Sequence, residues 1–143
     1  MAQAEHTVTI HRSAEDVFDY LADGRHNKQW RAGVLEIEPT GPVTGSGATY
    51  RQVLRGPMGR KIAGDYRVTT YDRPKTLAFE VIAGPARPTG TFQVTAVDAN
   101  TATVTFRLSA APSGVMRLFA PQIAKQMRVE TRQLDNLKAQ LEH

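Results

Sequence analysis

The alternation of apolar and polar positions divides the chain into a short strand, a helical stretch, a strand-rich middle and a helical end. Residues 6–10 alternate with period two, as a strand does. Ser13 then precedes apolar residues at helical spacing, which predicts a short helix that begins at this N-cap and ends at Asp23-Gly24. A second short helical turn is expected over residues 26–31, and a strand over 34–38.

The middle of the chain alternates with period two between turn sequences that recur roughly every 12 to 15 residues. This spacing leaves no room for crossover helices, so it predicts an antiparallel meander. The five expected strands are 48–55, 61–71, 76–83, 89–97 and 102–109. One face of each is mainly apolar, and these inner positions are Tyr50, Gln52, Leu54, Ile62, Tyr66, Val68, Leu77, Phe79, Val81, Phe92, Val94, Val104, Phe106 and Leu108. The other face carries charged and hydroxyl side chains, including Arg51 and Arg67, and is expected to be wet.

The end of the chain returns to helical spacing. Its apolar stripe consists of Phe119, Ile123, Met127, Leu134, Leu137 and Leu141. A continuous helix over 115–141 would be about 40 Å long. Pro121 either begins the main helix at its first turn or kinks a longer one, because proline supplies no backbone donor. The helix and the apolar sheet face bury each other, and because a twisted sheet curls, a cavity between them is expected.

Length and composition narrow the class of protein. The 143 residues predict one domain over 1–140, with 141–143 interpreted as the remnant of an affinity tag. The absence of cysteine excludes disulfides, thiolate metal sites and a cysteine nucleophile. No apolar run approaches the roughly 18 residues of a membrane span, so we expect a cytoplasmic monomer or homodimer without stable membrane insertion. The net charge of +4 comes without an aromatic stacking pattern, so no nucleic-acid partner is expected.

Short motifs spread along the chain resemble those of a known superfamily. They include Val17-Phe18-Asp19-Tyr20-Leu21, Trp30, Gly47-Ala48-Thr49-Tyr50-Arg51, Tyr66-Arg67-Val68 and a closing Leu137-Lys138. In this order they resemble the START-like or SRPBCC superfamily, in its polyketide cyclase/dehydrase and lipid transport branch, over nearly the whole chain. The resemblance implies an α+β helix-grip fold: a curved antiparallel sheet of six or seven strands around a long C-terminal helix, with two short helices after the first strand. It also implies that the first strand lies beside the last, and that the central cavity binds a hydrophobic small molecule.

Motifs for several reaction classes are absent from the sequence. Gly45-Ser46-Gly47 lacks the frame of a serine nucleophile elbow and is interpreted as a turn. The segment 56–61 has no Ser or Thr after its lysine, so it is not a phosphate-binding loop. The histidines show no spacing typical of ligands. No cofactor and no metal are therefore expected.

Glu130 is a carboxylate within the apolar stripe of the last helix. An apolar environment raises a carboxyl pKa, which would suit a general acid or base, or an anchor for a ligand hydroxyl. The alternative is that Glu130 reaches the rim or pairs with an arginine such as Arg67.

The candidate site combines aromatic and polar residues that would line the cavity. Gln52 is notable because an amide on the inner face is costly unless it is hydrogen-bonded. The predicted cavity residues are Trp30, Tyr50, Gln52, Leu54, Tyr66, Phe79, Phe92, Phe106, Phe119, Ile123, Met127 and Glu130. No complete catalytic set is visible among them.

Three functions are compatible with this site. Binding of a hydrophobic small molecule, such as a lipid or polyketide, needs only an enclosed apolar cavity with polar anchors. A polyketide cyclase or dehydrase activity is the alternative, and a protein-interaction module without ligand is the third. An interior with no cavity above a few water volumes would favour the interaction module.

Overall fold

The computed structural model describes residues 2–84 and 86–142. The strands are β1 (Ala2–Ile10), β2 (Val34–Pro39), β3 (Thr49–Arg55), β4 (Lys61–Ala63), β5 (Tyr66–Asp72), β6 (Thr76–Val81), β7 (Thr89–Asp98) and β8 (Thr101–Ala110). The α-helices are α1 (Ala14–Ala22), α2 (Asn27–Trp30), α3 (Ala120–Arg132) and α4 (Leu134–Leu141). The described residues also form the 3₁₀ segments η1 (Gly24–His26), η2 (Pro57–Gly59) and η3 (Gly114–Phe119).

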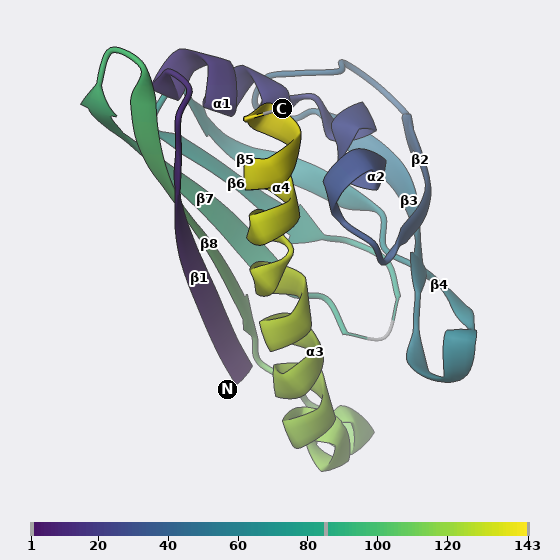
Figure 1. The fold of residues 1–143 in the computed structure, drawn as a ribbon. Coiled ribbons are helices and arrows are strands. Elements are labelled where there is room, and N and C mark those ends of the chain that lie inside the picture. Colours follow the sequence, from purple (N-terminus) through teal and green to yellow (C-terminus); the bar gives the residue numbers. More distant parts are fainter. Residues whose placement is uncertain (1, 85, 143) are drawn as a thin grey trace.

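All strands belong to one curved antiparallel sheet, and the helices lie on its concave face (Figure 1). The strand order is β1-β8-β7-β6-β5-β3-β2, with β4 paired to β3. β1 pairs with β8 from Ala2 opposite Ala110 to Ile10 opposite Ala102, as the resemblance implied. α3 packs against β1 and β8, while α4 packs against β1 and α2. This arrangement confirms the predicted helix-grip fold.

The strand expected over 61–71 is interrupted, so this prediction was wrong in detail. β4 pairs with the end of β3, and β5 pairs with its start, with Gly64 and Asp65 between them. The side chain of Gln52 explains the interruption, because its Nε2 donates to the Gly64 carbonyl at 3.2 Å. Asp65 accepts a bond from the Gln52 backbone N–H at 3.3 Å. One backbone bond remains here, from the Gly64 N–H to the Gln52 carbonyl at 2.8 Å, and the side-chain bonds accompany it where the regular ladder breaks.

The single continuous helix expected over 115–141 is likewise corrected. Its first part is the 3₁₀ segment η3, and the rest bends at Gln133 between α3 and α4. Pro121 lies in the first turn of α3, the first of the two alternatives, where its missing N–H costs nothing. The Gln133 side chain accepts bonds from the Ala32 N–H and from Asn136, which fixes the bend against α2.

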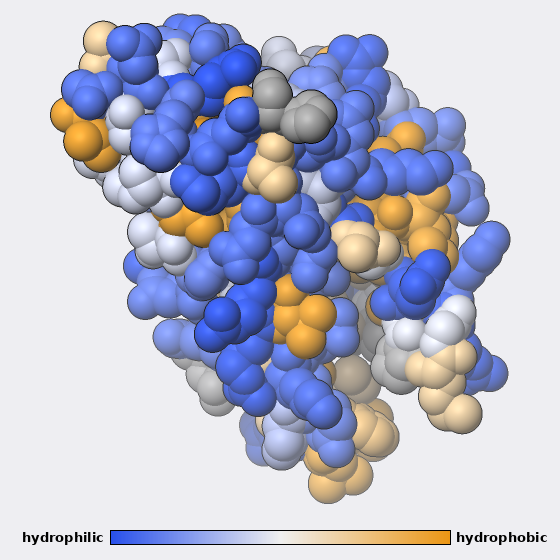
Figure 2. Space-filling view, viewed as in Figure 1, coloured by the Kyte–Doolittle hydropathy of each residue, from blue (hydrophilic) through white to orange (hydrophobic). Residues whose placement is uncertain are grey.

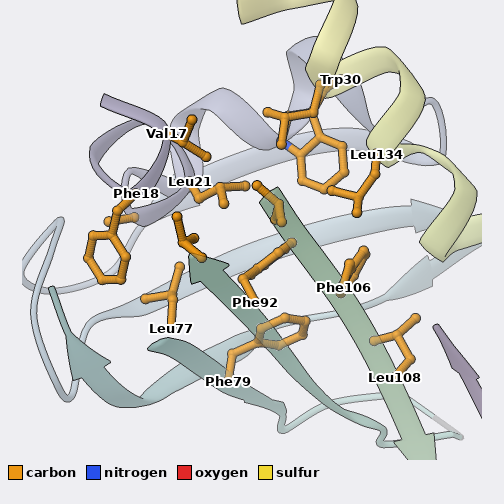
Figure 3. Close-up of a cluster of buried hydrophobic side chains, with 14 of the residues drawn as sticks. Val17, Phe18, Leu21, Trp30, Leu77, Phe79, Phe92, Phe106, Leu108 and Leu134 are labelled. Carbon is orange, nitrogen blue, oxygen red and sulfur yellow. The ribbon is translucent and has the colours of Figure 1, made fainter. Parts of the chain in front are cut away.

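The core lies between the helices and the concave face of the sheet (Figure 3). Ser13 caps the N-terminus of α1, and its hydroxyl accepts from the Asp16 N–H at 3.1 Å, as the sequence predicted. α4 contributes Leu134 and Leu137, both fully buried. Leu141 is buried as well, and the Glu142 carboxylate accepts bonds from Lys138 and His11. His143 lies outside the described residues.

Candidate functional site

Three polar side chains are hydrogen-bonded to one another inside the apolar core. Asn27 on α2 donates from Nδ2 to the Tyr66 hydroxyl at 3.0 Å and to Gln52 Oε1 at 3.3 Å. All three residues are at most 7% exposed. We call Asn27, Gln52 and Tyr66 the polar cluster. The predicted burial of Gln52 on the inner face is confirmed, and its bonds to Asn27 and Gly64 offset the cost of burying an amide.

Tyr50 stacks on Tyr66 with ring centroids 5.2 Å apart. Its hydroxyl donates to the Val43 carbonyl and accepts from the Gly24 N–H at 3.1 Å, so both of its hydrogen-bonding roles are used. Tyr50 therefore fixes the α1–α2 connection to the sheet. The absence of a Cβ on Gly24 permits this approach, since a Cβ there would lie 2.2 Å from the Tyr66 hydroxyl.

The Tyr66 hydroxyl has a donor that is not used in a hydrogen bond to a described residue. Its hydroxyl accepts from Asn27, but no described residue accepts the Tyr66 proton. Burial raises the pKa of Tyr66 well above its ordinary value, so the hydroxyl stays protonated at neutral pH. The Trp30 indole N–H is a second buried donor without a partner among the described residues. In Figure 3 its nitrogen lies on the side of the ring toward Leu21. Two donors in the interior are thus available to an acceptor.

Glu130 pairs with Arg31, not with Arg67. Its Oε2 accepts from Arg31 Nη2 at 3.0 Å and from Nε at 3.3 Å. The two side chains are 14% and 8% exposed, so the pair is largely buried. Arg67 pairs with Glu80 on the outer face of the sheet. Of the alternatives for Glu130, the structure shows the ion pair with an arginine; the suggested partner Arg67 was wrong, because the α2–β2 connection brings Arg31 over α3.

An aromatic wall surrounds the polar cluster. Phe92 and Phe106 stack with ring centroids 4.4 Å apart, and Phe79 lies between Tyr66 and Phe92. Trp30 meets both Phe92 and Phe106 edge-on. The fit is tight at Gly90, where a Cβ would lie 2.2 Å from the Phe79 ring. The sequence placed these aromatic residues on one face, and the structure brings them together.

The cavity at this site is small. It measures about 20 Å³, which is room for one water molecule. It is lined by polar and apolar side chains from α1, α2 and the sheet: Leu21, Ala22, Asn27, Arg31, Tyr66, Val68, Leu77, Phe79 and Phe92. The cavity expected from the curled sheet is therefore present only as a space for about one water molecule.

Several predicted site residues lie away from this cavity. Phe119 is 50% exposed, since it ends η3 instead of continuing the helical stripe, so its placement in the interior was wrong. Ile123 is half-buried and lines a second pocket, of about 200 Å³, between α3, η3 and the loops that follow β6 and β8. Met127 is buried in the core, and Leu54 is half-buried beside Ile62. Figure 2 shows the surface hollowed between α3 and the β3–β4 hairpin.

Asn27 and Arg31 were missed by the sequence interpretation. The signal was present, because Asn27, Trp30 and Arg31 are spaced three and four residues apart and so share one face of a helical turn. Because Trp30 was assigned to the interior, Asn27 and Arg31 on the same helical face could have been assigned to the interior as well.

Within residues 2–84 and 86–142, no three His, Asp or Glu side chains gather as a metal site requires. No helix in the described part of the chain has both the length and the apolar character of a membrane span.

The fold and the enclosed site define a helix-grip domain with a polar cluster inside an aromatic core. The chain belongs to the family described as "Polyketide cyclase / dehydrase and lipid transport", which matches residues 1–142. No curated protein sequence matches it.

Solved structures share this fold at low sequence identity. A START superfamily protein from Mycobacterium smegmatis is 14% identical, with a TM-score of 0.80 over 99% of this chain and 98% of that one. A protein from Thermus thermophilus is 18% identical, with a TM-score of 0.80 over 97% and 96%. The Zhui aromatase/cyclase from Streptomyces sp. R1128 is 20% identical, with a TM-score of 0.69 over 98% and 90%.

Proposed function

We propose that the domain binds a hydrophobic small molecule between the sheet and the α3 helix, with the polar cluster as its anchor. The observation that carries this proposal is the pair of buried donors without acceptors, the Tyr66 hydroxyl and the Trp30 indole N–H. A buried donor without an acceptor costs about 1–3 kcal/mol, so a bound molecule that supplies an acceptor oxygen would stabilise the fold. A ligand carbonyl or hydroxyl oxygen would satisfy either one. The aromatic wall supplies the apolar contact for the rest of such a molecule.

Entry of a ligand requires the cavity to widen, since its present volume admits only water. The structure contains a suitable element for this movement. α4 is held by Leu134, Leu137 and Leu141 in the core, whereas no side chain in the first half of α3, residues 120–126, is fully buried. A rotation of α3 about the bend at Gln133 would draw Glu130 away from Arg31, which lines the cavity, while α4 stays in place. The Arg31–Glu130 pair, which joins α2 to α3, would hold the closed state.

The test is a binding measurement with 1-anilinonaphthalene-8-sulfonate, an aromatic probe with acceptor oxygens. We expect saturable binding at one site, about tenfold weaker for Tyr66→Phe, because loss of a buried hydrogen bond costs about 1 kcal/mol or more. Tyr71→Phe is the matched control, since Tyr71 is on the same strand and lies outside the cavity. Equal affinity of both variants and the wild type would contradict the proposal.

The closed interior favours one other candidate, a protein-interaction module without ligand. Extraction of the natively purified protein, followed by mass spectrometry of the extract, distinguishes the two. A stoichiometric hydrophobic compound is expected for the binding function, and none for the interaction module. If the compound recovered after incubation is chemically changed, the cyclase or dehydrase alternative replaces simple binding.

A further inference from the structure

Exposed apolar side chains gather at one end of the molecule. On η3, Val115 is 73% exposed, Leu118 77% and Phe119 50%. Met58, at the tip of the β3–β4 hairpin, is 99% exposed. Single exposed apolar residues are ordinary, but three within a six-residue segment form a patch. Figure 1 places η3 at the lower end of α3, with the hairpin to its right, and Figure 2 shows apolar residues protruding at both places.

Met58 adopts a backbone conformation that disfavours a side chain. Its φ of 60° lies in the left-handed region, which a glycine adopts without cost and a methionine does not. The methionine nevertheless projects fully into solvent at the hairpin tip. Strained backbone conformations cluster at functional sites, where the surrounding structure maintains them.

The same end carries basic side chains that have no carboxylate partner among the described residues. Segments 51–64, 82–97 and 99–129 contain no Asp or Glu. Arg60, Arg87, Arg117 and Lys125 belong to these segments, and none of the four makes an ion pair with a described residue. We call these four residues, together with Met58, Val115, Leu118 and Phe119, the η3 end.

The parts of the η3 end are neighbours in space. The second pocket brings Ala86 and Arg87 against Met116 on η3 and Ile123 on α3. The loop after β6 also approaches β4, because Gly84 lies against the Ala63 carbonyl. This loop therefore lies between the base of the β3–β4 hairpin and η3, and it lines the 200 Å³ pocket together with η3 and α3.

We propose that the η3 end docks reversibly on an anionic lipid surface. Apolar side chains on protruding tips insert between lipid headgroups, and flanking Arg and Lys side chains meet the lipid phosphates. A protein partner would instead need a broad, flat or concave apolar area, whereas here the apolar side chains lie on a hairpin tip and a short 3₁₀ segment. Such docking places side chains at the membrane surface and requires no segment that spans the bilayer. It does not depend on the ligand-binding function proposed above.

The experiment is co-sedimentation of the purified protein with vesicles of phosphatidylcholine alone, or with roughly 30% phosphatidylglycerol. We expect binding to the anionic vesicles only, with loss at high salt. Val115→Gln with Leu118→Gln is expected to reduce partitioning about tenfold or more, because two apolar side chains leave the interface. Arg60→Gln, Arg117→Gln and Lys125→Gln are each expected to reduce it about fivefold.

Matched controls come from the opposite end of the sheet. Val97→Gln alters an exposed valine near the β7–β8 turn, and Lys75→Gln removes one charge in the β5–β6 turn. Neither variant is expected to change partitioning. Docking at the η3 end is overturned if the wild type fails to sediment with anionic vesicles, as it would if the surface served an acidic protein. It is also overturned if the control variants lose binding as strongly as those at the η3 end.

Discussion

The Arg31–Glu130 ion pair permits a quantitative test of how the interior is held together. Glu130→Met removes the carboxylate and leaves the guanidinium of Arg31, 8% exposed, without its partner. Removing one member of a buried pair costs about 3–5 kcal/mol, and residual exposure of both side chains favours the lower end. We therefore expect a loss of about 3 kcal/mol in the free energy of unfolding. For a chain of this length, that corresponds to a decrease in Tm of about 10 °C.

The double variant Arg31→Met with Glu130→Met separates two quantities: the free-energy cost of an unpaired buried charge and the net contribution of the ion pair to stability. Because it removes both charges from the interior, we expect it to be more stable than Glu130→Met alone. Urea denaturation of the wild type, both single variants and the double variant gives the coupling energy, expected at about 2 kcal/mol. Glu80→Met is the control, since its pair with Arg67 is exposed on the outer face and is worth less than about 1 kcal/mol. The reasoning is refuted if Glu130→Met costs no more than Glu80→Met, or if the two single losses simply add.

Three further outcomes follow from residues described above. Leu134→Ala, at a fully buried position, is expected to cost about 3 kcal/mol, whereas Leu118→Ala, 77% exposed, should stay within about 0.5 kcal/mol; equal Tm decreases for the two would contradict the burial. Burial raises the pKa of Tyr66 above 10.0, so the contribution of its neutral hydroxyl to the free energy of unfolding is fully present below pH 10.0 and decreases as the pH rises beyond it. Tyr66→Phe should make this alkaline decrease in stability shallower, and an unaltered profile would argue against a buried hydroxyl. Bonds from Lys138 and the His11 N–H lower the pKa of Glu142 from 4.5 to about 2, so its stabilisation is present above pH 4.5 and is lost between these two values; Glu142→Gln should flatten Tm against pH in this range, and an unchanged slope would count against it.

The fold could be predicted from the sequence because its elements are specified locally. Alternation on β7 and β8, the N-cap at Ser13 and the proline at the start of α3 are all signals that extend over only a few residues. The two breaks were not predictable in the same way. The gap between β4 and β5 depends on the bond that Gln52 on β3 makes to Gly64, and the bend at Gln133 depends on Ala32, 101 residues away in the chain.

The candidate site was predictable only in part, for a related reason. Period two assigned Gln52, Tyr66 and Phe92 to the inner face, and all three are buried there. The partner of Glu130 depends on how α2 leads into β2, which no periodicity encodes, so Arg31 was missed. Phe119 matched the helical stripe by spacing alone, but η3 is a 3₁₀ segment with about three residues per turn, which turns that side chain outward.

The pairing of β1 with β8 determines the order in which parts of the sheet can form during synthesis. Val8 has its sheet partner in Val104, so β1 leaves the ribosome without its neighbour and waits for nearly a hundred further residues. At a translation rate of about 5–20 residues per second, this interval lasts on the order of 5–20 s. The strands from β5 to β7 follow one another as hairpins and can pair as they emerge, whereas β1 and the helices that pack on it assemble last. Closure of the interior is therefore a late event, and the nascent chain exposes the apolar edge of its sheet until that moment.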